Sequence, residues 1–249
     1  MRHEFSKKMK PLSVLLLAGV LTACATSASK TESADVYLQL GIRYLNMNKI
    51  ELAEENLERA LKKDPGNPKV HNALAILYEK INQFDKAEDQ YESAIDLAPD
   101  DLGALNNFGR FLCEHGKQER GLALLKQAIS APLNDQLWMA LTNAGRCQVE
   151  MKNRQGAEDY FREALQLNAT YAPALLEMQK ISYQKSDFWG AKGYLERYLG
   201  VAEHTSETLW LAMQTERALG NEKMAEHYRM RLLEKFPLSN EAKKINPAP

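Results

Sequence analysis

The residue types that carry out catalysis are present in this sequence, but their spacing does not form a catalytic group. Downstream of residue 24 the histidines are His71, His115, His204 and His227, and none is paired convincingly with a nucleophile. Cys113 and His115 are close in sequence, but residues two apart point in different directions on a helix. The sequence contains no HExxH, GxGxxG or Walker motif. We therefore predict that the protein is not an enzyme and has no metal site, no cofactor and no small-molecule substrate.

The cysteine at position 24 has a different setting, one suited to covalent modification. The chain begins with the basic residues Arg2, Lys7, Lys8 and Lys10, continues with an apolar run over 11–21, and then reaches Thr22, Ala23 and Cys24. This is the order of a secretory signal and its cleavage site, and the run is too short to span a bilayer. The sequence Leu-Thr-Ala-Cys resembles the lipobox of bacterial lipoproteins, which implies a covalent lipid on Cys24. The alternative is an ordinary signal peptide followed by a cysteine by chance.

Lipidation would decide where the protein resides. We predict a signal peptide at 1–23, and a lipidated cysteine with a flexible tether at 24–33, because residues 25–33 are small and polar. Several acyl chains hold a protein firmly on a membrane. Ala25 follows the cysteine where an aspartate would signal retention, so resemblance to known lipoproteins implies the periplasmic face of the outer membrane. Retention at the inner membrane is the alternative.

The composition of the whole chain limits the possible functions. Of its 249 residues, 45% are hydrophobic and 26% are charged, which is typical of a folded globular protein rather than a disordered one. The formal net charge of −1 provides no general positive field for nucleic acid. We therefore predict no nucleic-acid partner.

The elements that position the remaining residues follow a period of 34 residues. A self-alignment at this shift places Tyr37, Leu40, Gly41, Tyr44, Ala53, Leu57, Ala60 and Pro65 over His71, Leu74, Ala75, Tyr78, Ala87, Tyr91, Ala94 and Pro99. This pattern of large, small and aromatic residues resembles the tetratricopeptide repeat, in which two antiparallel helices cross closely at small residues. Proline then ends the second helix.

Extending the period predicts six repeats, which begin at residues 34, 68, 102, 138, 172 and 206 and occupy 34–245. The fifth and sixth repeats match the pattern least well. We therefore predict an all-α fold, a right-handed superhelical solenoid of about twelve antiparallel helices. The last residues, 246–249, are predicted to fray.

In a tetratricopeptide repeat the first helix lines a concave groove, so the groove residues can be predicted from their positions. In repeat one they include Leu38, Ile42 and Leu45, which share one helix face, and repeat two adds Asn72 and Ile76. An apolar stripe of this kind suits the apolar face of a partner peptide. The alternative is that the stripe packs against a preceding segment of the same chain.

Farther along, the predicted groove becomes polar. Its residues in repeats three and four include Asn106, Asn107, Arg110 and Arg146. Two parallel guanidinium groups flanked by amides could hold a peptide backbone or a carboxylate. The alternative is a pair of solvated arginines with local acidic partners such as Glu114 and Glu150.

Two cysteines lie on the first helices of these same adjacent repeats. Because the signal sequence predicts an oxidising compartment, we expect a disulfide between Cys113 and Cys147. Closing this separation of 34 residues would stabilise the fold by about 3 to 4 kcal/mol in the chain-entropy treatment. The alternative is two buried thiols that act as small apolar residues.

Together these features resemble one family, the type IV pilus pilotins (PilF/PilW). The resemblance covers essentially the full chain: a lipobox, six repeats, and the segments ALNNFGRFLCEHG at 104–116 and NAGRC at 143–147. It implies a protein that binds secretin subunits of the type IV pilus and promotes their outer-membrane localisation and multimerisation, attached to the membrane by its lipid. The alternative is a lipoprotein adaptor of the barrel-protein insertion machinery or of peptidoglycan enzymes.

Overall fold

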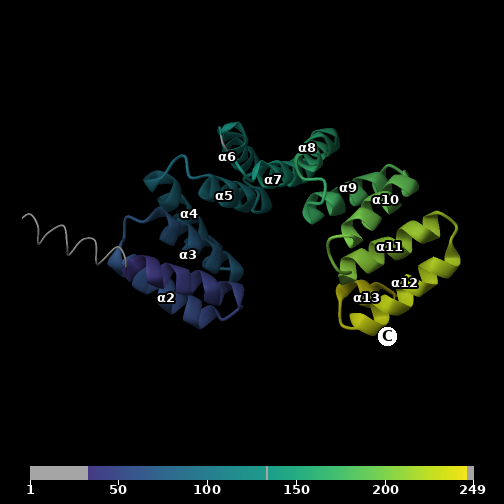
Figure 1. Ribbon diagram of the computed structural model, residues 1–249, viewed down its shortest axis with the longest axis horizontal. Coiled ribbons are helices and arrows are strands. Elements are labelled where there is room, and N and C mark those ends of the chain that lie inside the picture. Colours follow the sequence, from purple (N-terminus) through teal and green to yellow (C-terminus); the bar gives the residue numbers. More distant parts are fainter. Residues whose placement is uncertain (1–32, 133, 246–249) are drawn as a thin grey trace, which may run out of the picture. The chain divides into compact units, whose positions relative to one another are not determined.

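The computed structural model describes residues 33–132 and 134–245, and within them every regular element is a helix (Figure 1). After a helix at 33–46 the elements are α2 (Ile50–Lys63), α3 (Pro68–Lys80), α4 (Phe84–Leu97), α5 (Leu102–Glu114), α6 (Gln118–Ser130), α7 (Leu137–Glu150), α8 (Arg154–Leu167), α9 (Ala172–Gln184), α10 (Phe188–Leu199), α11 (Ser206–Ala218), α12 (Glu222–Lys235) and α13 (Asn240–Ile245). The prediction of an all-α fold is confirmed. The predicted signal peptide, the lipidation site at Cys24 and the tail lie outside the described residues.

The helices form two compact units, which are described separately. The first unit ends at Ala104 and the second begins at Leu105, so the boundary falls inside α5. Consecutive helices pack as pairs, α3 on α4 in unit 1, and α7 on α8, α9 on α10 and α11 on α12 in unit 2. The first helices of the pairs begin at, or one residue before, the repeat starts expected from the period. Among the described residues, no helix is both long and apolar enough to cross a bilayer.

Local chemistry explains where the helices start and turn. Asn67 caps α3 by accepting a hydrogen bond from the backbone N–H of Lys69 at 3.1 Å, and Pro68 occupies the first turn, where its missing donor costs nothing. The turn inside each helix pair contains one residue with positive φ. These residues are Asn48, Asn82, Gly116, Lys152, Ser186 and Gly220. Asparagine and glycine adopt this conformation readily, whereas lysine does not.

The core of unit 1 lies between the helix at 33–46 and α2 and α3. Leu57 and Leu74 are almost completely buried in it. A Cβ atom on Gly41 would lie 2.6 Å from the side chain of Leu57, so the small residue is what allows the two helices to approach. In the next pair the buried Tyr91 satisfies its hydroxyl by donating to Glu79, at 3.0 Å.

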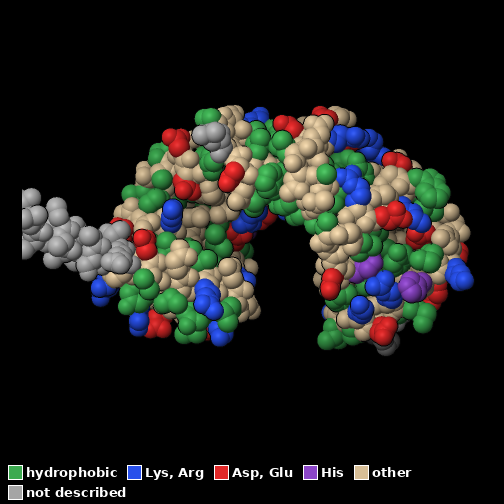
Figure 2. Space-filling model, in the orientation of Figure 1, with side chains coloured by type: hydrophobic (Ala, Val, Ile, Leu, Met, Phe, Trp, Pro, Cys, Tyr) green, Lys and Arg blue, Asp and Glu red, His purple; other side chains and the backbone are tan. Residues whose placement is uncertain are grey.

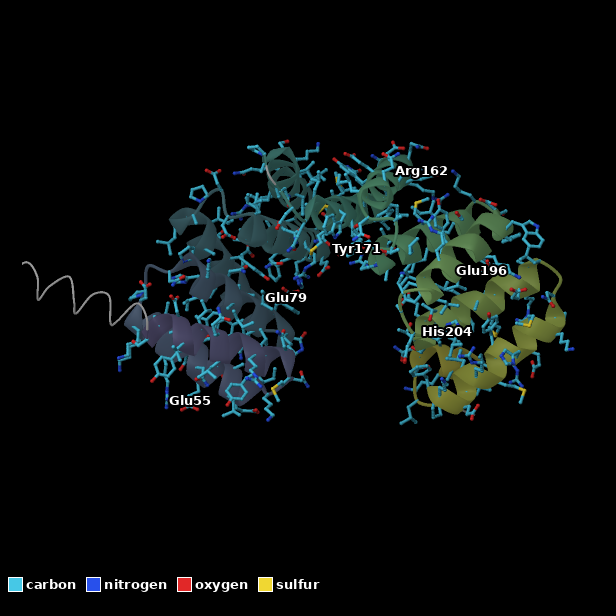
Figure 3. The ribbon with its side chains drawn as sticks, viewed as in Figure 1. Glu55, Glu79, Arg162, Tyr171, Glu196 and His204 are labelled. Carbon is cyan, nitrogen blue, oxygen red and sulfur yellow. A yellow bond between two sulfur atoms is a disulfide. The ribbon has the colours of Figure 1, made fainter. Side chains whose placement is uncertain are left out.

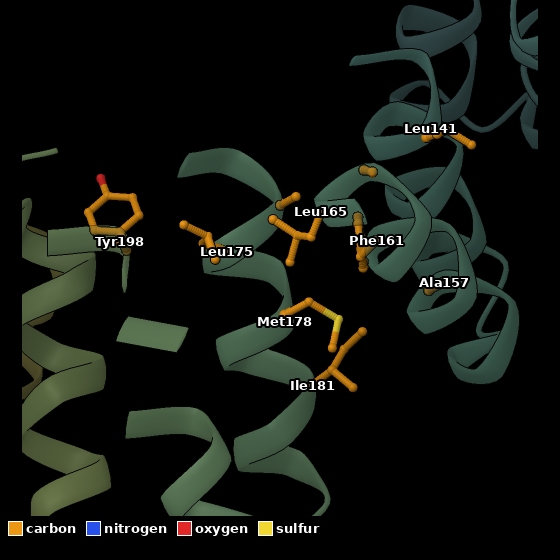
Figure 4. Packing of buried hydrophobic residues seen from close by; sticks show 10 residues of the cluster. Leu141, Ala157, Phe161, Leu165, Leu175, Met178, Ile181 and Tyr198 are labelled. Atoms are coloured by element: carbon orange, nitrogen blue, oxygen red, sulfur yellow. The ribbon is translucent and has the colours of Figure 1, made fainter. Parts of the chain in front are cut away.

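The core of unit 2 repeats this design around a larger side chain. Phe161 of α8 is fully buried and packs with Leu141, Leu175 and Met178 (Figure 4). Gly145 of α7 faces it closely, because a Cβ atom there would lie 2.5 Å from the Phe161 ring. The helices therefore touch where the repeat pattern places its small residue.

One buried carboxylate joins the fourth and fifth helix pairs. Glu158 of α8 is almost completely buried, and it accepts hydrogen bonds from Arg162 at 2.7 Å and from Lys185, at the end of α9, at 2.9 Å. These hydrogen bonds hold the pKa of Glu158 below its usual value. Arg162, labelled in Figure 3, is itself largely exposed, so the pair lies at the surface edge of the core.

Candidate partner-binding site

The apolar stripe predicted in repeat one is only partly a surface. Leu38 is 3% exposed and Leu45 is 7% exposed, and both belong to the buried cluster that contains Val70 and Leu77 of α3. The prediction that Leu38 and Leu45 form an open groove is therefore wrong. The first helix of a repeat packs against that of the next repeat, and large aliphatic side chains on both helices close over these positions.

Two isoleucines of unit 1 remain partly accessible. Ile42 and Ile76 are half-buried and pack against the edge of the same cluster, and Asn72, one turn before Ile76 on α3, is half-buried as well. Ile42 and Ile76 are the ninth residues of repeats one and two. The apolar part of the predicted groove in unit 1 is thus smaller than the sequence suggests and centres on this position.

In unit 2 the predicted polar residues come together on α5 and α7. The Nδ2 atom of Asn143 donates to Oδ1 of Asn106 at 3.0 Å, while Asn107 is half-buried beside it in the chain. Arg110 forms an ion pair with Glu114, one turn away, at 2.7 Å. The acidic partner expected for this arginine is therefore present.

Arg146 has a different partner from the one expected. Its Nε atom lies 3.1 Å from Oε1 of Glu177 on α9, rather than against Glu150 of its own helix. The same glutamate also pairs with Lys180, whose Nζ atom lies 3.7 Å from Oε1 of Glu177. That Nζ atom lies 2.8 Å from Oε1 of Glu207 on α11 as well. A chain of ion pairs thus links α7, α9 and α11.

Three residues of this series were not predicted from the sequence: Glu177, Lys180 and Glu207. Lys180 is the ninth residue of repeat five, equivalent to Arg110 and Arg146, so the repeat spacing contained the signal. The poor match of repeat five to the pattern concealed it.

Beneath the arginines, a disulfide joins Cys113 of α5 to Cys147 of α7, with their Cα atoms 5.2 Å apart. Both cysteines are buried. They form part of the lining of an open pocket of about 310 Å³, to which Arg110, Asn143 and Arg146 also contribute. Unit 2 therefore presents a polar groove whose first two helices are covalently joined.

Among the described residues, no three or more histidine, cysteine, aspartate and glutamate side chains gather in a group that could hold a metal. Both ring nitrogens of His71 are hydrogen-bonded. Nδ1 lies 2.8 Å from Oε1 of Gln90, and Nε2 lies 2.9 Å from the carbonyl oxygen of Pro65. What the grooves can do is hold a polypeptide through amides, guanidinium groups and aliphatic side chains.

His204, in the last part of unit 2 (Figure 3), has a strongly perturbed pKa. Burial and the positive charges of Arg231 and Lys235 lower its pKa from 6.5 to about 4. The Nδ1 atom of His204 lies 3.2 Å from the hydroxyl oxygen of Thr208, a residue that forms part of the capping box of α11. We interpret His204 as a structural residue.

Similarity to known proteins agrees with this geometry. Family models of the tetratricopeptide repeat match residues 38–102 and 140–171. The type IV pilus assembly protein PilF of Pseudomonas aeruginosa is 28% identical over 237 residues, which cover 92% of this chain and 94% of PilF.

Two solved structures have the same fold over most of their length. A P. aeruginosa PilF structure superposes with a TM-score of 0.76 and 26% identity, and it covers 87% of this chain and 98% of that one. The crystal structure of PilW, described as a widely conserved type IV pilus biogenesis factor, gives the same TM-score and identity, with 85% and 97% coverage.

The helix pairs, their small-residue crossings and the groove define a protein of the tetratricopeptide-repeat class. Within that class the chain is homologous to PilF and PilW, and it belongs with these tetratricopeptide proteins of type IV pilus biogenesis.

Proposed function

We propose that this protein is a lipid-anchored pilotin, which binds secretin subunits of the type IV pilus at the outer membrane and promotes their localisation and multimerisation. The observation that carries the proposal is the similarity to PilF along almost the whole of both chains, in sequence and in fold. The lipobox-like segment ending at Cys24 supports the membrane anchor. The grooves support a role in binding rather than catalysis.

The proposed anchor has a physical role in assembly. A lipid on Cys24 would confine the protein to the membrane surface and so raise its effective concentration near other membrane-associated subunits. A solenoid then offers an extended surface to a segment of the partner. Membrane anchor and groove would act together, and loss of either should reduce assembly.

We place the secretin contact in unit 1, on the half-buried residues Ile42 and Ile76 and the neighbouring Asn72. Substituting the buried Leu38 would destabilise the core and could not separate binding from folding. Ile42→Asp combined with Ile76→Asp is the more informative variant. Leu52→Asp, on a side chain that is 40% exposed on α2, is the matched control.

The test measures the heat-resistant secretin multimer and its monomer in outer-membrane fractions after deletion of the gene. We expect the multimer to disappear while the monomer persists, with rescue by the wild type and by Leu52→Asp. Cys24→Ser and the double isoleucine variant should not rescue. An unchanged multimer, accompanied by depleted outer-membrane barrels or altered cell-wall enzyme activity, would contradict the proposal and favour an adaptor of another machinery.

A further inference from the structure

A second open pocket lies beside the disulfide-lined one in unit 2 and has a different charge. Its volume is about 380 Å³, and it shares Val149, Glu177 and Lys180 with the first pocket. This volume lies in the range of pockets that hold a ligand, or one or two side chains of a peptide. The two pockets therefore form one continuous groove along α7 and α9.

The charges around the second pocket are predominantly positive. Lys152, Arg154 and Lys180 line it, against the single carboxylate of Glu177. That carboxylate already lies 3.1 Å from Arg146, and Lys180 is paired with Glu207. Neither Lys152 nor Arg154 forms an ion pair with a described residue, so the excess positive charge resides on these two side chains.

This excess is local. Figure 2 shows basic and acidic side chains interspersed over the visible face of the protein. A pocket with unpaired cations on a chain of nearly zero net charge is therefore a distinct feature, which favours a ligand that brings negative charge.

The backbone at Lys152 is a further observation in support. Lys152 has a φ of 60°, in the left-handed region that disfavours a residue with a long side chain. The equivalent turns of the other five repeats have asparagine, glycine or serine, and four of these five are asparagine or glycine. A lysine at this position destabilises the turn relative to those residues. Its side chain lines the pocket.

The pocket also has an aliphatic wall. Val149 stands 44% exposed between the two pockets, and the buried Ile181 lines the second pocket below it. A ligand that fits both the wall and the cations combines a carboxylate with a neighbouring aliphatic group. An extended peptide segment supplies these two groups on adjacent residues.

We propose that the Lys152–Arg154 pocket of unit 2 binds the carboxylate of an acidic, aliphatic peptide segment of a partner protein. The carboxylate is an aspartate or glutamate side chain within that segment. This site is separate from the secretin contact proposed in unit 1 and does not depend on it.

Three fluorescent eight-residue peptides distinguish the sources. The first alternates aspartate and leucine and is blocked at both ends; the second alternates serine and leucine and has a free C-terminal carboxylate; the third alternates lysine and leucine and is blocked. Fluorescence anisotropy with the full chain measures their affinities at low and at 0.3 M salt. We expect the first peptide to bind at least about tenfold more tightly than the third, and less tightly at high salt.

The decisive variant is Lys152→Gly, because it removes the ammonium group and relieves the backbone at the same time. It should unfold no more easily than the wild type and yet bind the favoured peptide about tenfold more weakly. Arg154→Gln should act in the same direction. Lys126→Gln, on an exposed lysine of α6 that forms no ion pair with another described residue, is the charge-matched control and should bind as the wild type does.

Each outcome decides between the alternatives. Preference for the first peptide supports an internal acidic side chain, whereas equal binding or preference for the second overturns that assignment in favour of a C-terminal carboxylate. The proposal is overturned if neither binds better than the lysine peptide, or if Lys152→Gly and Arg154→Gln leave the affinity unchanged.

Discussion

Breaking the bond between Cys113 and Cys147 tests how unit 2 is held together. The bond joins α5 to α7 and encloses the whole of α6 between its ends. The two first helices are also linked by the hydrogen bond from Asn143 to Asn106. The disulfide should therefore contribute a large share of the stability of this part of the unit.

The magnitude follows from the sequence separation of 34 residues. Closing a loop of this length lowers the entropy of the unfolded chain by about 13 cal/mol/K, which corresponds to about 3.8 kcal/mol at 25 °C. With an m-value of about 2 kcal/mol per molar urea, the unfolding midpoint of unit 2 should fall by about 2 M when the bond is absent. An effect of this size would be easily measured.

The assay is urea unfolding followed by circular dichroism, with and without dithiothreitol. The matched control is Cys113→Ala combined with Cys147→Ala, which fills the buried space with small apolar groups and has no bond to reduce. We expect the reductant to lower the midpoint of the wild type and to leave that of the variant unchanged. Thiol titration in denaturant should detect two additional thiols in the reduced wild type. An equal response of both proteins to the reductant would refute the reasoning.

Three further predictions concern single side chains of unit 2. The folded state favours neutral His204, whose pKa is lowered from 6.5 to about 4, so stability should be present above pH 6.5 and decline as the pH falls toward 4. Allowing for solvent screening of this half-buried ring, the loss between pH 7.5 and 5 is about 1 kcal/mol, and urea unfolding of His204→Asn should lack that part of the pH dependence. Glu158→Gln should lower the free energy of unfolding at pH 7 by about 1 to 2 kcal/mol, because its hydrogen bonds lose their charge assistance, and an unchanged midpoint would contradict this role. Gly145→Ala should cost about 1 to 3 kcal/mol in thermal unfolding because its Cβ would collide with Phe161, whereas the control Gly193→Ala has no neighbour within 4 Å and should be neutral or stabilising.

The fold could be predicted because the repeat pattern specifies contacts. Gly145 and Phe161 occupy the small and large positions of repeat four, and the structure packs one directly against the other. Each repeat applies the same rule, so the period of 34 residues predicts both the helices and their crossings. Even a repeat that matches the pattern poorly forms its helices, because its neighbour provides the apolar surface on which it packs.

The grooves could be predicted less well, because exposure depends on neighbouring helices as well as on position. Leu38 and Leu45 occupy groove positions, but the large side chains of α3 cover them. The sequence also could not say which carboxylate each arginine selects. Arg110 pairs within its helix, whereas Arg146 reaches Glu177 on the following repeat.

The ninth residue of each repeat relates the two proposals to each other. It is isoleucine in the first two repeats, at Ile42 and Ile76, and basic in the next three, at Arg110, Arg146 and Lys180. Lys180 also lines the positively charged Lys152–Arg154 pocket, so the two units are suited to different segments, or to different partners. Variants in one unit should therefore leave binding at the other intact. The loss of both bindings from a single well-folded variant would instead contradict the independence of the two sites.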